Sequence, residues 1–342
     1  MSAERSPTLH RPGLDSLRTV SIIATGSYVP DRVLTNTELE KFVDTTDEWI
    51  YTRTGIRQRH IAEDHQATSD LAIAAARKAM ENGNIRPEEI DYLIVATCTP
   101  DMHFPSTACM VQKELGATNA ACVDLSAACS GFVYAIDMAR QYIQSGTMNT
   151  ALVIGAEKMS CLLDWEDRAT CVLFGDGAGA AILQARGDQY GILTSVLGGD
   201  GKLGDLLNVP GGGSRLPITP EVLADKQHVL KMAGREVFKH AVTGMAGAAQ
   251  ETLRRCGATI DDVACIIPHQ ANARIIQAIS QRIDAPMEKF YVNLDRFGNT
   301  SAASVIMAID EAARKGRIQR GDLVLLVVFG AGFTWAASLL EW

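Results

Sequence analysis

Three residues whose types together support covalent acyl chemistry follow predicted strands in this sequence. Cys129 lies after an apolar strand and at the start of a predicted helix, where free backbone amides and the helix dipole lower a thiol pKa. His269 directly follows a buried strand and a proline, and Asn299 stands at a second strand-to-helix connection. A cysteine nucleophile with a histidine and an asparagine is a constellation for acyl transfer, provided that the fold brings the three together.

Each of these features also has an ordinary structural interpretation. A cysteine among alanines is most often a packed core residue, and Cys98, Cys122, Cys171 and Cys265 fit that description because they lie within predicted strands. An asparagine at a helix start is commonly an N-cap, and a loop histidine is commonly hydrogen-bonded without further function. The segment 330–332, Gly-Ala-Gly, offers backbone amides for an oxyanion hole or forms a simple turn, and the sequence leaves both open.

The elements that must position these residues occur twice along the chain. A predicted helix at 69–82 and strand at 92–97 recur as 242–255 and 263–267, and each strand is stopped by a proline. Equivalent positions are about 170 residues apart, which indicates a duplicated α/β half. Continuous Val, Ile and Leu strands alternating with amphipathic helices imply sheets that are covered on both faces.

The repeat continues toward the candidate residues. Segment 122–125 resembles 291–294, and helical segment 135–137 resembles 308–310, at nearly the same offset. Each helix leads into another apolar strand. Two such halves would pack about a pseudo-twofold axis, so that equivalent strand ends meet and the three candidate residues converge.

The halves are not separated by a Gly/Ser-rich linker, so we expect one compact body with a boundary near 185–189. It consists of an N-terminal half, 19–187, and a C-terminal half, 188–342. A loose leader, 1–18, precedes them. The leader carries charges and no apolar core, so it is not a secretory signal.

Composition excludes several classes of protein. The chain has 342 residues, 47% of them hydrophobic, which allows a large core, and its net charge of -8 argues against a nucleic-acid binder. The apolar run 323–329 is far shorter than the ~20 residues that span a membrane. The eight cysteines form no CxxC pair, which favours reduced thiols in a cytoplasmic protein and neither a disulfide framework nor a metal site.

A glycine-rich segment, 175–180, has a faint likeness to a dinucleotide-binding loop. The residues that follow it, 181–183, form a predicted strand instead of a helix, so this interpretation fails. The sequence also contains no P-loop motif. We therefore expect no nucleotide cofactor held by either motif.

With these residues identified, the chain from about Val20 to Trp342 resembles β-ketoacyl-acyl carrier protein synthase III, the initiating condensing enzyme of type II fatty acid synthesis. The resemblance rests on the segments 47–50 with 52–56, 128–132, 174–179, 268–272, 298–303 and 332–335. It implies the thiolase fold, a five-layer αβαβα arrangement of the two α/β halves, and a homodimer. It also implies that Cys129, His269 and Asn299 form the catalytic triad.

The same resemblance implies roles for further residues. The amides of Cys129 and Ala331 would form the oxyanion hole, and Phe104 would reach the acyl pocket of the partner subunit. Trp49 and Arg168 would enclose the adenine of coenzyme A. The full expected set for coenzyme A is Thr45, Trp49, Arg53 and Arg168, and the positions expected to dock the carrier protein are Lys239 and Arg274.

The expected reaction is the decarboxylative condensation of a short acyl-CoA, with acetyl-CoA as the expected primer, and malonyl-acyl carrier protein. It needs no metal or redox cofactor. A related thiolase-fold condensing enzyme or acyltransferase of secondary metabolism, a cysteine hydrolase and a non-enzymatic subunit of a synthase complex are the alternatives. Departures from the family pattern are Leu-Ser-Ala-Ala-Cys-Ser at 125–130, the Gly-Ala-Gly loop, and Arg235 where some members have asparagine.

A basic face offers a way for this acidic chain to bind an acidic carrier. Lys231, Arg235 and Lys239 recur every four residues in a segment predicted to be helical, 231–242, which would place them along one face. Arg274 and Arg282 follow His269 closely and can lie near the mouth of the site. An ordinary solvated face is the alternative interpretation.

Overall fold

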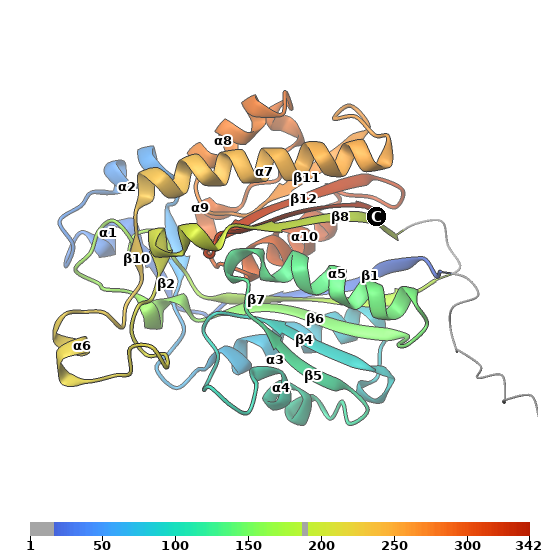
Figure 1. Ribbon diagram of the computed structural model, residues 1–342, viewed down its shortest axis with the longest axis horizontal. Coiled ribbons are helices and arrows are strands. Elements are labelled where there is room, and N and C mark those ends of the chain that lie inside the picture. Colours follow the sequence, from blue (N-terminus) through green and yellow to red (C-terminus); the bar gives the residue numbers. More distant parts are fainter. Residues whose placement is uncertain (1–16, 187–190) are drawn as a thin grey trace, which may run out of the picture.

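The computed structural model describes residues 17–186 and 191–342, which build two main β-sheets (Figure 1). The first sheet has the order β1-β7-β6-β4-β5 and the second has the order β11-β12-β13-β8. In the first, β4 is parallel to β5 and β6; in the second, β11 is parallel to β12; the remaining neighbours are antiparallel. The strands are β1 (Val20–Tyr28), β4 (Tyr92–Ala96), β5 (Ala121–Leu125), β6 (Thr150–Glu157), β7 (Gly177–Ala185), β8 (Gly191–Gly199), β11 (Val263–Pro268), β12 (Leu323–Gly330) and β13 (Thr334–Glu341).

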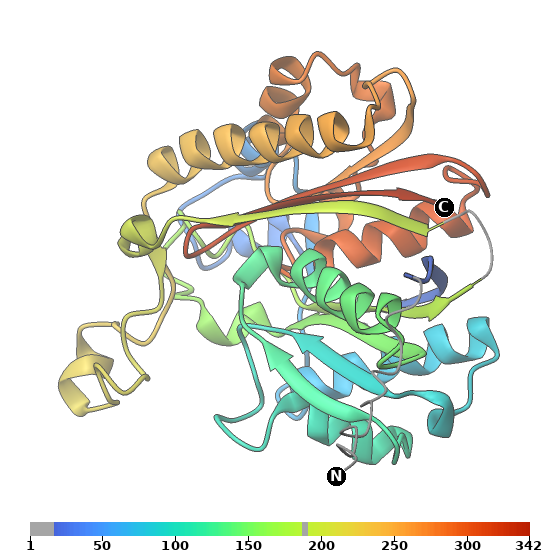
Figure 2. The same ribbon diagram turned by 45° about the vertical axis from the view of Figure 1, so that its right-hand side comes forward.

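Six helices complete the layers. Two lie on the outer face of the first sheet, two between the sheets, and two on the outer face of the second, as Figures 1 and 2 show. In that order they are α3 (Thr68–Gly83), α4 (Thr107–Leu115), α5 (Gly131–Gln144), α10 (Ala303–Arg314), α7 (Gly234–Cys256) and α8 (Ala273–Arg282). The expected αβαβα arrangement of the thiolase fold is confirmed.

Smaller elements surround one end of these layers. They are β2 (Val33–Thr35), α1 (Asn36–Leu39), α2 (Asp47–Thr54), β3 (Gln58–His60), β9 (Leu207–Asn208), α6 (Pro220–Ala224), β10 (Lys231–Met232) and α9 (Leu294–Phe297). In both views α6 projects from the body (Figures 1 and 2), whereas α2 packs against α8. No helix among the described residues is long and apolar enough to cross a membrane.

The burial pattern explains why these sequences form central elements. All eight residues of β6 are buried because helices cover both faces of its sheet, and this is why the strand reads as a continuous apolar run. The ten residues from Ala303 to Ala312 in α10 are likewise all buried, because this helix lies between two sheets. The small side chains of α5 and α10 allow the close packing that the middle layer requires.

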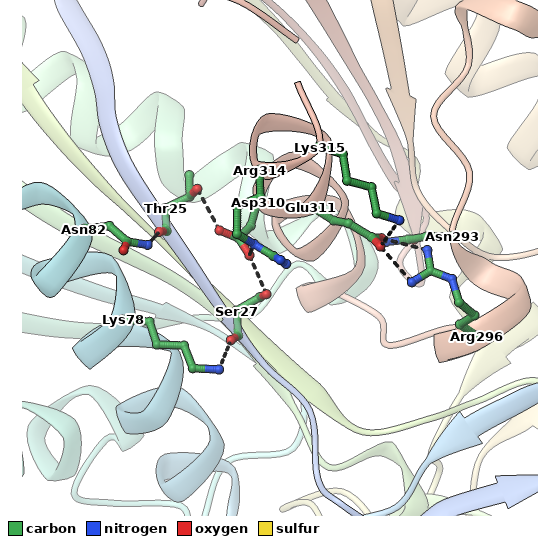
Figure 3. A network of polar contacts seen from close by, with 10 residues as sticks. All are labelled: Thr25, Ser27, Lys78, Asn82, Asn293, Arg296, Asp310, Glu311, Arg314 and Lys315. Carbon is green, nitrogen blue, oxygen red and sulfur yellow. Dashed lines mark hydrogen bonds and ion pairs between the residues drawn. The ribbon is translucent and has the colours of Figure 1, made fainter. Parts of the chain in front are cut away.

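Acidic residues of α10 join the two halves of the chain (Figure 3). Asp310 accepts hydrogen bonds from Thr25 Oγ1 at 3.0 Å and Ser27 Oγ at 2.6 Å, both on β1. Glu311 accepts two from Arg296, at 2.7 and 2.8 Å. Burial alone raises the pKa of Glu311, but Arg296, Lys315 and Asn293 together lower it to about 2, so this side chain is an ionised anchor. Helix α10, which follows Asn299, is therefore held by β1 on one side and by Arg296 on another.

The order of strands repeats between the sheets, with one exception. β1-β7-β6-β4 corresponds to β8-β13-β12-β11, but the second sheet has no counterpart of β5. The prediction that 291–294 forms a strand like 122–125 is wrong: Phe290 makes an isolated bridge to Ile266, and Leu294 already begins α9.

Three smaller predictions need correction. Cys98 follows β4 and Cys171 lies in a turn, so neither is within a strand. Lys231 belongs to β10, and α7 begins only at Gly234, so Lys231 does not continue the helical face of Arg235 and Lys239. Most of the leader and the half boundary lie outside the described residues, but Arg18 is not loose, because its Nε donates to the Ile143 carbonyl at 2.8 Å.

Candidate active site

Cys129 stands in a single 3-10 turn, Ala128–Ser130, between β5 and α5. The C-terminal half holds this turn: Ser130 Oγ donates to the Thr334 carbonyl at 3.1 Å, and Thr334 Oγ1 donates to the Ala127 carbonyl at 3.0 Å. Gly330 also packs against it, because a Cβ at this position would lie 2.7 Å from the Cys129 backbone nitrogen. The Cys129 turn and the end of β12 therefore fit together only without a side chain at 330.

His269 follows β11 and is buried. Its backbone nitrogen donates to the Val327 carbonyl at 2.8 Å, which ties it to β12, and its Nδ1 is 2.7 Å from Ser304 Oγ on α10. Ser304 Oγ also accepts from the Gln270 amide at 3.4 Å, so its own proton is free to be donated to Nδ1. This pairing favours the tautomer with the proton on Nε2, the other ring nitrogen.

Asn299 is held by the glycine-rich segment that resembled a dinucleotide loop. Its backbone nitrogen donates to the Leu173 carbonyl at 2.8 Å, and its carbonyl accepts from Gly175 at 3.1 Å. The side-chain Oδ1 accepts from the Ser301 amide at 2.9 Å, which leaves the Nδ2 hydrogens to donate elsewhere. Segment 177–185 is a strand, β7, as predicted from its sequence.

The three candidate residues meet at one cavity of about 240 Å³, here called the Trp49 cavity. Cys129, His269 and Asn299 all line it, although the latter two follow Cys129 by more than a hundred residues in the chain. Its walls are mostly apolar and include Phe174, Phe238, Met245, Ile275 and Phe329. A thiol, an imidazole and an amide thus share a confined apolar space.

Cys129 also lines a second cavity of about 470 Å³, here called the Met159 cavity. Its other lining residues include Met159, Leu162, Leu230 and Ala331. Among the lining residues, Cys129, Phe174 and Leu207 belong to both cavities. The thiol therefore stands where two spaces meet, one that leads toward Trp49 and one that is lined by aliphatic side chains.

Trp49, Arg53 and Arg168 gather at the Trp49 cavity, as the resemblance led us to expect. The guanidinium carbons of Arg53 and Arg168 lie 4.6 and 5.0 Å from the centre of the Trp49 ring. Arg168 Nη1 also donates to the Asp44 carbonyl at 2.7 Å. Next to Asp44, the Thr45 hydroxyl is buried without a hydrogen-bond partner, which leaves a donor and acceptor for a ligand.

Burial dominates the electrostatics of the site. It raises the pKa of the Cys129 thiol to about 12; a hydrogen bond from Ser301 lowers this pKa, and the charge of Glu157 raises it. The expectation that the helix start leaves Cys129 with a low pKa is therefore not met, because α5 begins two residues later and the thiol is desolvated. Burial also lowers the pKa of His269 to about 3, so its imidazole is neutral.

The other expected residues lie outside both cavities. Phe104 is 84% exposed on the loop after β4. Arg235, Lys239 and Arg282 are exposed on α7 and α8. Arg274, also on α8, donates from Nη2 to the Thr52 carbonyl at 3.0 Å, so it braces the helix that carries Trp49.

Sequence reasoning missed several groups behind the three candidate residues. Ser304 positions His269, the Ser301 amide donates to Asn299 Oδ1, and Glu157 is a buried carboxylate that accepts a hydrogen bond from Ser301 Oγ at 2.9 Å. The available signals were a glutamate closing a wholly apolar strand and two serines within five residues of Asn299. Residues 17–186 and 191–342 contain no cluster of three His, Cys, Asp or Glu side chains that could hold a metal ion.

Two parts of the chain match descriptions of a known protein family. Residues 123–201 match 3-oxoacyl-acyl-carrier-protein (ACP) synthase III, and residues 253–342 match the description of its C-terminal part. A β-ketoacyl-acyl-carrier-protein synthase III from Caldanaerobacter subterraneus subsp. tengcongensis is 55% identical over 94% of this chain and 97% of its own length.

Solved structures agree in fold. The 3-oxoacyl-acyl-carrier-protein synthase III of Aquifex aeolicus VF5 superposes with a TM-score of 0.88 at 46% identity, covering 94% of this chain and 100% of its own. The priming β-ketosynthase of the R1128 polyketide biosynthetic pathway reaches a TM-score of 0.90 at 37% identity, with 98% of both chains covered.

Proposed function

The chain belongs to the β-ketoacyl-acyl carrier protein synthase III family, and from this premise we propose that it condenses an acyl-CoA primer with malonyl-acyl carrier protein to initiate fatty acid synthesis. The observation that carries the proposal is the position of Cys129 at the junction of two cavities, with His269 and Asn299 lining one of them. This arrangement suits a thiol that first accepts an acyl group and then passes it to a second substrate.

In the first half-reaction the Cys129 sulfur attacks the thioester carbon of the primer, and coenzyme A leaves. The acyl chain is then held in the Met159 cavity, whose aliphatic lining suits it. The amides of Cys129 and Ala331 are the candidate donors to the developing oxyanion, and both residues line that cavity. Each such donor contributes about 3 to 4 kcal/mol to transition-state stabilisation in comparable sites.

In the second half-reaction malonyl-acyl carrier protein loses carbon dioxide, which leaves an enolate on its thioester. His269 Nε2 and Asn299 Nδ2 donate hydrogen bonds to the enolate oxygen. Two features support this role. The imidazole is neutral. Ser304 Oγ engages His269 Nδ1, and the Ser301 amide engages Asn299 Oδ1, so His269 Nε2 and Asn299 Nδ2 are the donors available to the cavity. The carbon of the enolate then attacks the acyl group on Cys129.

Coenzyme A would lie along the Trp49 cavity. Its adenine would insert between Trp49 and Arg168, whose guanidinium carbon lies 5.0 Å from the Trp49 ring centre, and its phosphates would meet Arg53. The unpartnered hydroxyl of Thr45 supports a ligand at this position. These residues bind and orient the primer; no resident metal or redox cofactor is part of the proposal.

A homodimer is the proposed assembly. β5 is an edge strand of the first sheet with partly exposed apolar side chains at Val123 and Leu125, and such an edge can pair with a second copy. Phe104 lies on the loop after β4, the strand that pairs with β5, and its ring is largely exposed. Insertion into the partner's Met159 cavity would bury it.

The acyl carrier protein would dock on the cations of α7 and α8, Arg235, Lys239, Arg274 and Arg282, with Lys231 on β10 nearby. We also propose a cytoplasmic location, which the eight free cysteines support, and division of the chain into a leader at 1–18 and halves at 19–187 and 188–342. A secondary-metabolic condensing enzyme is not favoured, because the polyketide relative is 37% identical to this chain, whereas the Caldanaerobacter synthase III is 55% identical.

The test is the mass of the product from acetyl-CoA and malonyl-acyl carrier protein, with peptide mapping of the intermediate. We expect acetoacetyl-acyl carrier protein and an acetyl group on Cys129. A Cys129→Ala variant should form neither, whereas Cys256→Ala, which alters an exposed thiol at the end of α7, should behave as wild type. Release of free acetate without condensation would refute the proposal in favour of a hydrolase.

A further inference from the structure

Glu157 is a buried carboxylate that lies behind the candidate active site. It ends β6, is fully buried, and is absent from the lining of both cavities. In the part of the chain that the structure describes, every hydrogen bond that it accepts comes from an uncharged group: Thr97 Oγ1 at 3.2 Å, Thr99 Oγ1 at 2.7 Å, the Cys98 amide and thiol, and Ser301 Oγ at 2.9 Å. Burial of a carboxylate without a cation is costly, so its presence here needs a structural or catalytic reason.

Ser301 links this carboxylate to Asn299 across the two halves of the chain. Its Oγ donates to Glu157 Oε1 at 2.9 Å, and its backbone amide donates to Asn299 Oδ1, also at 2.9 Å. Glu157 and Ser301 are 144 residues apart in the sequence, and both are buried. The hydroxyl of Ser301 therefore anchors the residue to β6, while its amide reaches a side chain of the candidate triad.

The side-chain amide of Asn299 has two chemically different ends, and only one of them suits the proposed reaction. Nδ2 carries hydrogens that it can donate to an enolate oxygen, whereas Oδ1 carries none. If the amide were rotated by half a turn, Oδ1 would face the enolate oxygen and the two electron-rich atoms would repel each other. Because the Ser301 N–H can pair with Oδ1 and not with Nδ2, this hydrogen bond selects the orientation that leaves Nδ2 to the cavity.

Ser301 makes both hydrogen bonds from an uncommon backbone conformation. Its φ of 48° lies in the left-handed region, which a residue with a Cβ rarely adopts. The value of φ sets the direction of the amide relative to the side chain. At an ordinary negative φ, the hydroxyl bond to Glu157 and the amide bond to Asn299 could not be made together. The conformation therefore needs a contact that stabilises it, and the bond to Glu157 is such a contact.

Strand β6 is also shaped to receive the segment that contains Ser301. Gly155 and Glu157 are alternate residues of this strand, so they face the same side of the sheet. A Cβ at position 155 would lie 2.5 Å from the carbonyl oxygen of Ala302, which shows that the backbone next to Ser301 lies directly against the strand. A close backbone approach at Gly155 and a hydrogen bond at Glu157 thus hold the same segment, and they are independent observations.

We propose that Glu157 is a positioning residue for Asn299: it holds Ser301 in the left-handed conformation, and Ser301 orients the Asn299 amide with Nδ2 toward the enolate. The inference rests on the proposed function, because it assigns Glu157 to the condensation step. Glu157 should affect the kcat of that step and not its KM, since the Asn299 donor acts on charge that develops only as carbon dioxide leaves. Neither Glu157 nor Ser301 transfers a proton in this role.

An effect of Glu157 on Cys129 would have a different signature. The charge of Glu157 raises the pKa of the Cys129 thiol, so it opposes formation of the thiolate. Glu157→Gln should therefore acylate Cys129 at least as fast as wild type. A variant that is slow in condensation but not in acylation separates the positioning of Asn299 from any effect on the thiol.

The test measures the two half-reactions separately. Each protein is acetylated with acetyl-CoA, freed of the excess, and mixed with malonyl-acyl carrier protein in a rapid-quench instrument. In Glu157→Gln the rate of condensation at saturating carrier protein should fall at least about tenfold, while the KM stays within about twofold of wild type. Thr97→Val removes a different donor to Glu157 and should condense as wild type does. If wild type itself does not condense, the proposed function fails; if Glu157→Gln condenses as fast as wild type, only the positioning role fails.

Two variants of Ser301 decide the question even if Glu157→Gln does not fold. Both Ser301→Ala and Ser301→Gly remove the hydroxyl, but glycine adopts a φ of 48° readily and alanine does not. Ser301→Ala should slow condensation from the acetyl-enzyme as Glu157→Gln does, and the double variant should lose no more than either, because both changes remove one hydrogen bond. Ser301→Gly should condense at least about threefold faster than Ser301→Ala. Additive losses in the double variant, or equal rates in the two Ser301 variants, would overturn the positioning role.

Discussion

Ala128 and Ser301 occupy equivalent places in the two halves of the chain, and both adopt the left-handed backbone conformation, with φ of 45° and 48°. Ala128 immediately precedes Cys129, and Ser301 follows Asn299 by two residues. Non-glycine residues rarely adopt this conformation, and those that do cluster at functional sites. The turn that leads into the middle-layer helix, α5 or α10, therefore has the same backbone conformation in both halves, with a sulfur beside it in one half and an amide and a hydroxyl in the other.

Separating the two half-reactions tests the roles of the other two residues of the triad. His269→Ala and Asn299→Ala should each lower the condensation rate by at least about a hundredfold, because each removes a donor to the enolate. Cys129 acylation should fall much less, since neither residue is proposed to act on the thiol. Rapid-quench measurement of acetyl-enzyme and of product separates the steps; condensation at the wild-type rate in either variant would contradict the role.

The burial of His269 predicts a pH dependence of stability. Its pKa is about 3 in the folded state and 6.5 when exposed, so below pH 6.5 the unfolded chain binds a proton that the folded chain does not. The stabilisation is complete above pH 6.5 and is lost as pH falls toward 3. Between pH 6.5 and pH 5 the loss is about 2 kcal/mol.

Urea unfolding of wild type and His269→Gln at these two pH values measures this contribution. The glutamine variant cannot titrate, and every other group changes equally in both proteins. Its unfolding free energy should therefore fall by about 2 kcal/mol less than that of wild type over the same interval. An equal decrease in the two proteins would show that His269 is protonated in the folded state.

Phe104 is expected to limit primer length across the proposed dimer interface. Phe104→Ala should shift preference from acetyl-CoA toward longer acyl-CoA, because a ring that closes the partner's Met159 cavity is removed. Met102→Ala, which alters an exposed apolar side chain on the same loop, is the matched control and should leave the preference unchanged. If both variants keep the wild-type primer profile, Phe104 does not belong to the acyl pocket.

Lys239 tests the docking surface more cleanly than Arg274. Lys239→Glu should raise the KM for malonyl-acyl carrier protein several-fold, with a larger effect at low salt, while acylation by acetyl-CoA changes little. Arg274→Glu should affect both steps, because Arg274 also braces α2 and hence Trp49. Arg186→Glu is the control for net charge, because Arg186 is exposed, directly follows the last residue of β7 and lines neither cavity. Equal losses in Lys239→Glu and Arg186→Glu would assign the effect to overall charge.

Local patterns in the sequence predicted the covered sheets, the duplicated half and the three candidate residues, whereas the five-layer order came from the family resemblance. Apolar strands, amphipathic helices and a repeated order were enough to bring Cys129, His269 and Asn299 to one place. The strand predicted at 291–294 failed because Asn293 donates its backbone amide to Gln270, 23 residues away, and Leu294 turns into α9. Such a competing partner is invisible in a local pattern.

Groups that support the site were missed for a related reason. Glu157 and Ser301 are 144 residues apart, and His269 and Ser304 are 35 apart, so neither pair has a spacing signature. The direction of the Cys129 pKa was also wrong, since the helix start is local but the desolvation comes from the whole fold. Sequence patterns located the candidate residues, and tertiary packing determines the direction of their pKa shifts.

The meeting of the two cavities at Cys129 has a kinetic consequence. Under the proposed function, coenzyme A and the carrier's pantetheine arm both reach the thiol through the Trp49 cavity, while the acyl chain waits in the Met159 cavity. The two substrates cannot occupy the passage together, so turnover must be ping-pong, with parallel lines in double-reciprocal plots. Free coenzyme A would compete with the second substrate for the Trp49 cavity, so a higher concentration of coenzyme A would slow the start of each new round of synthesis.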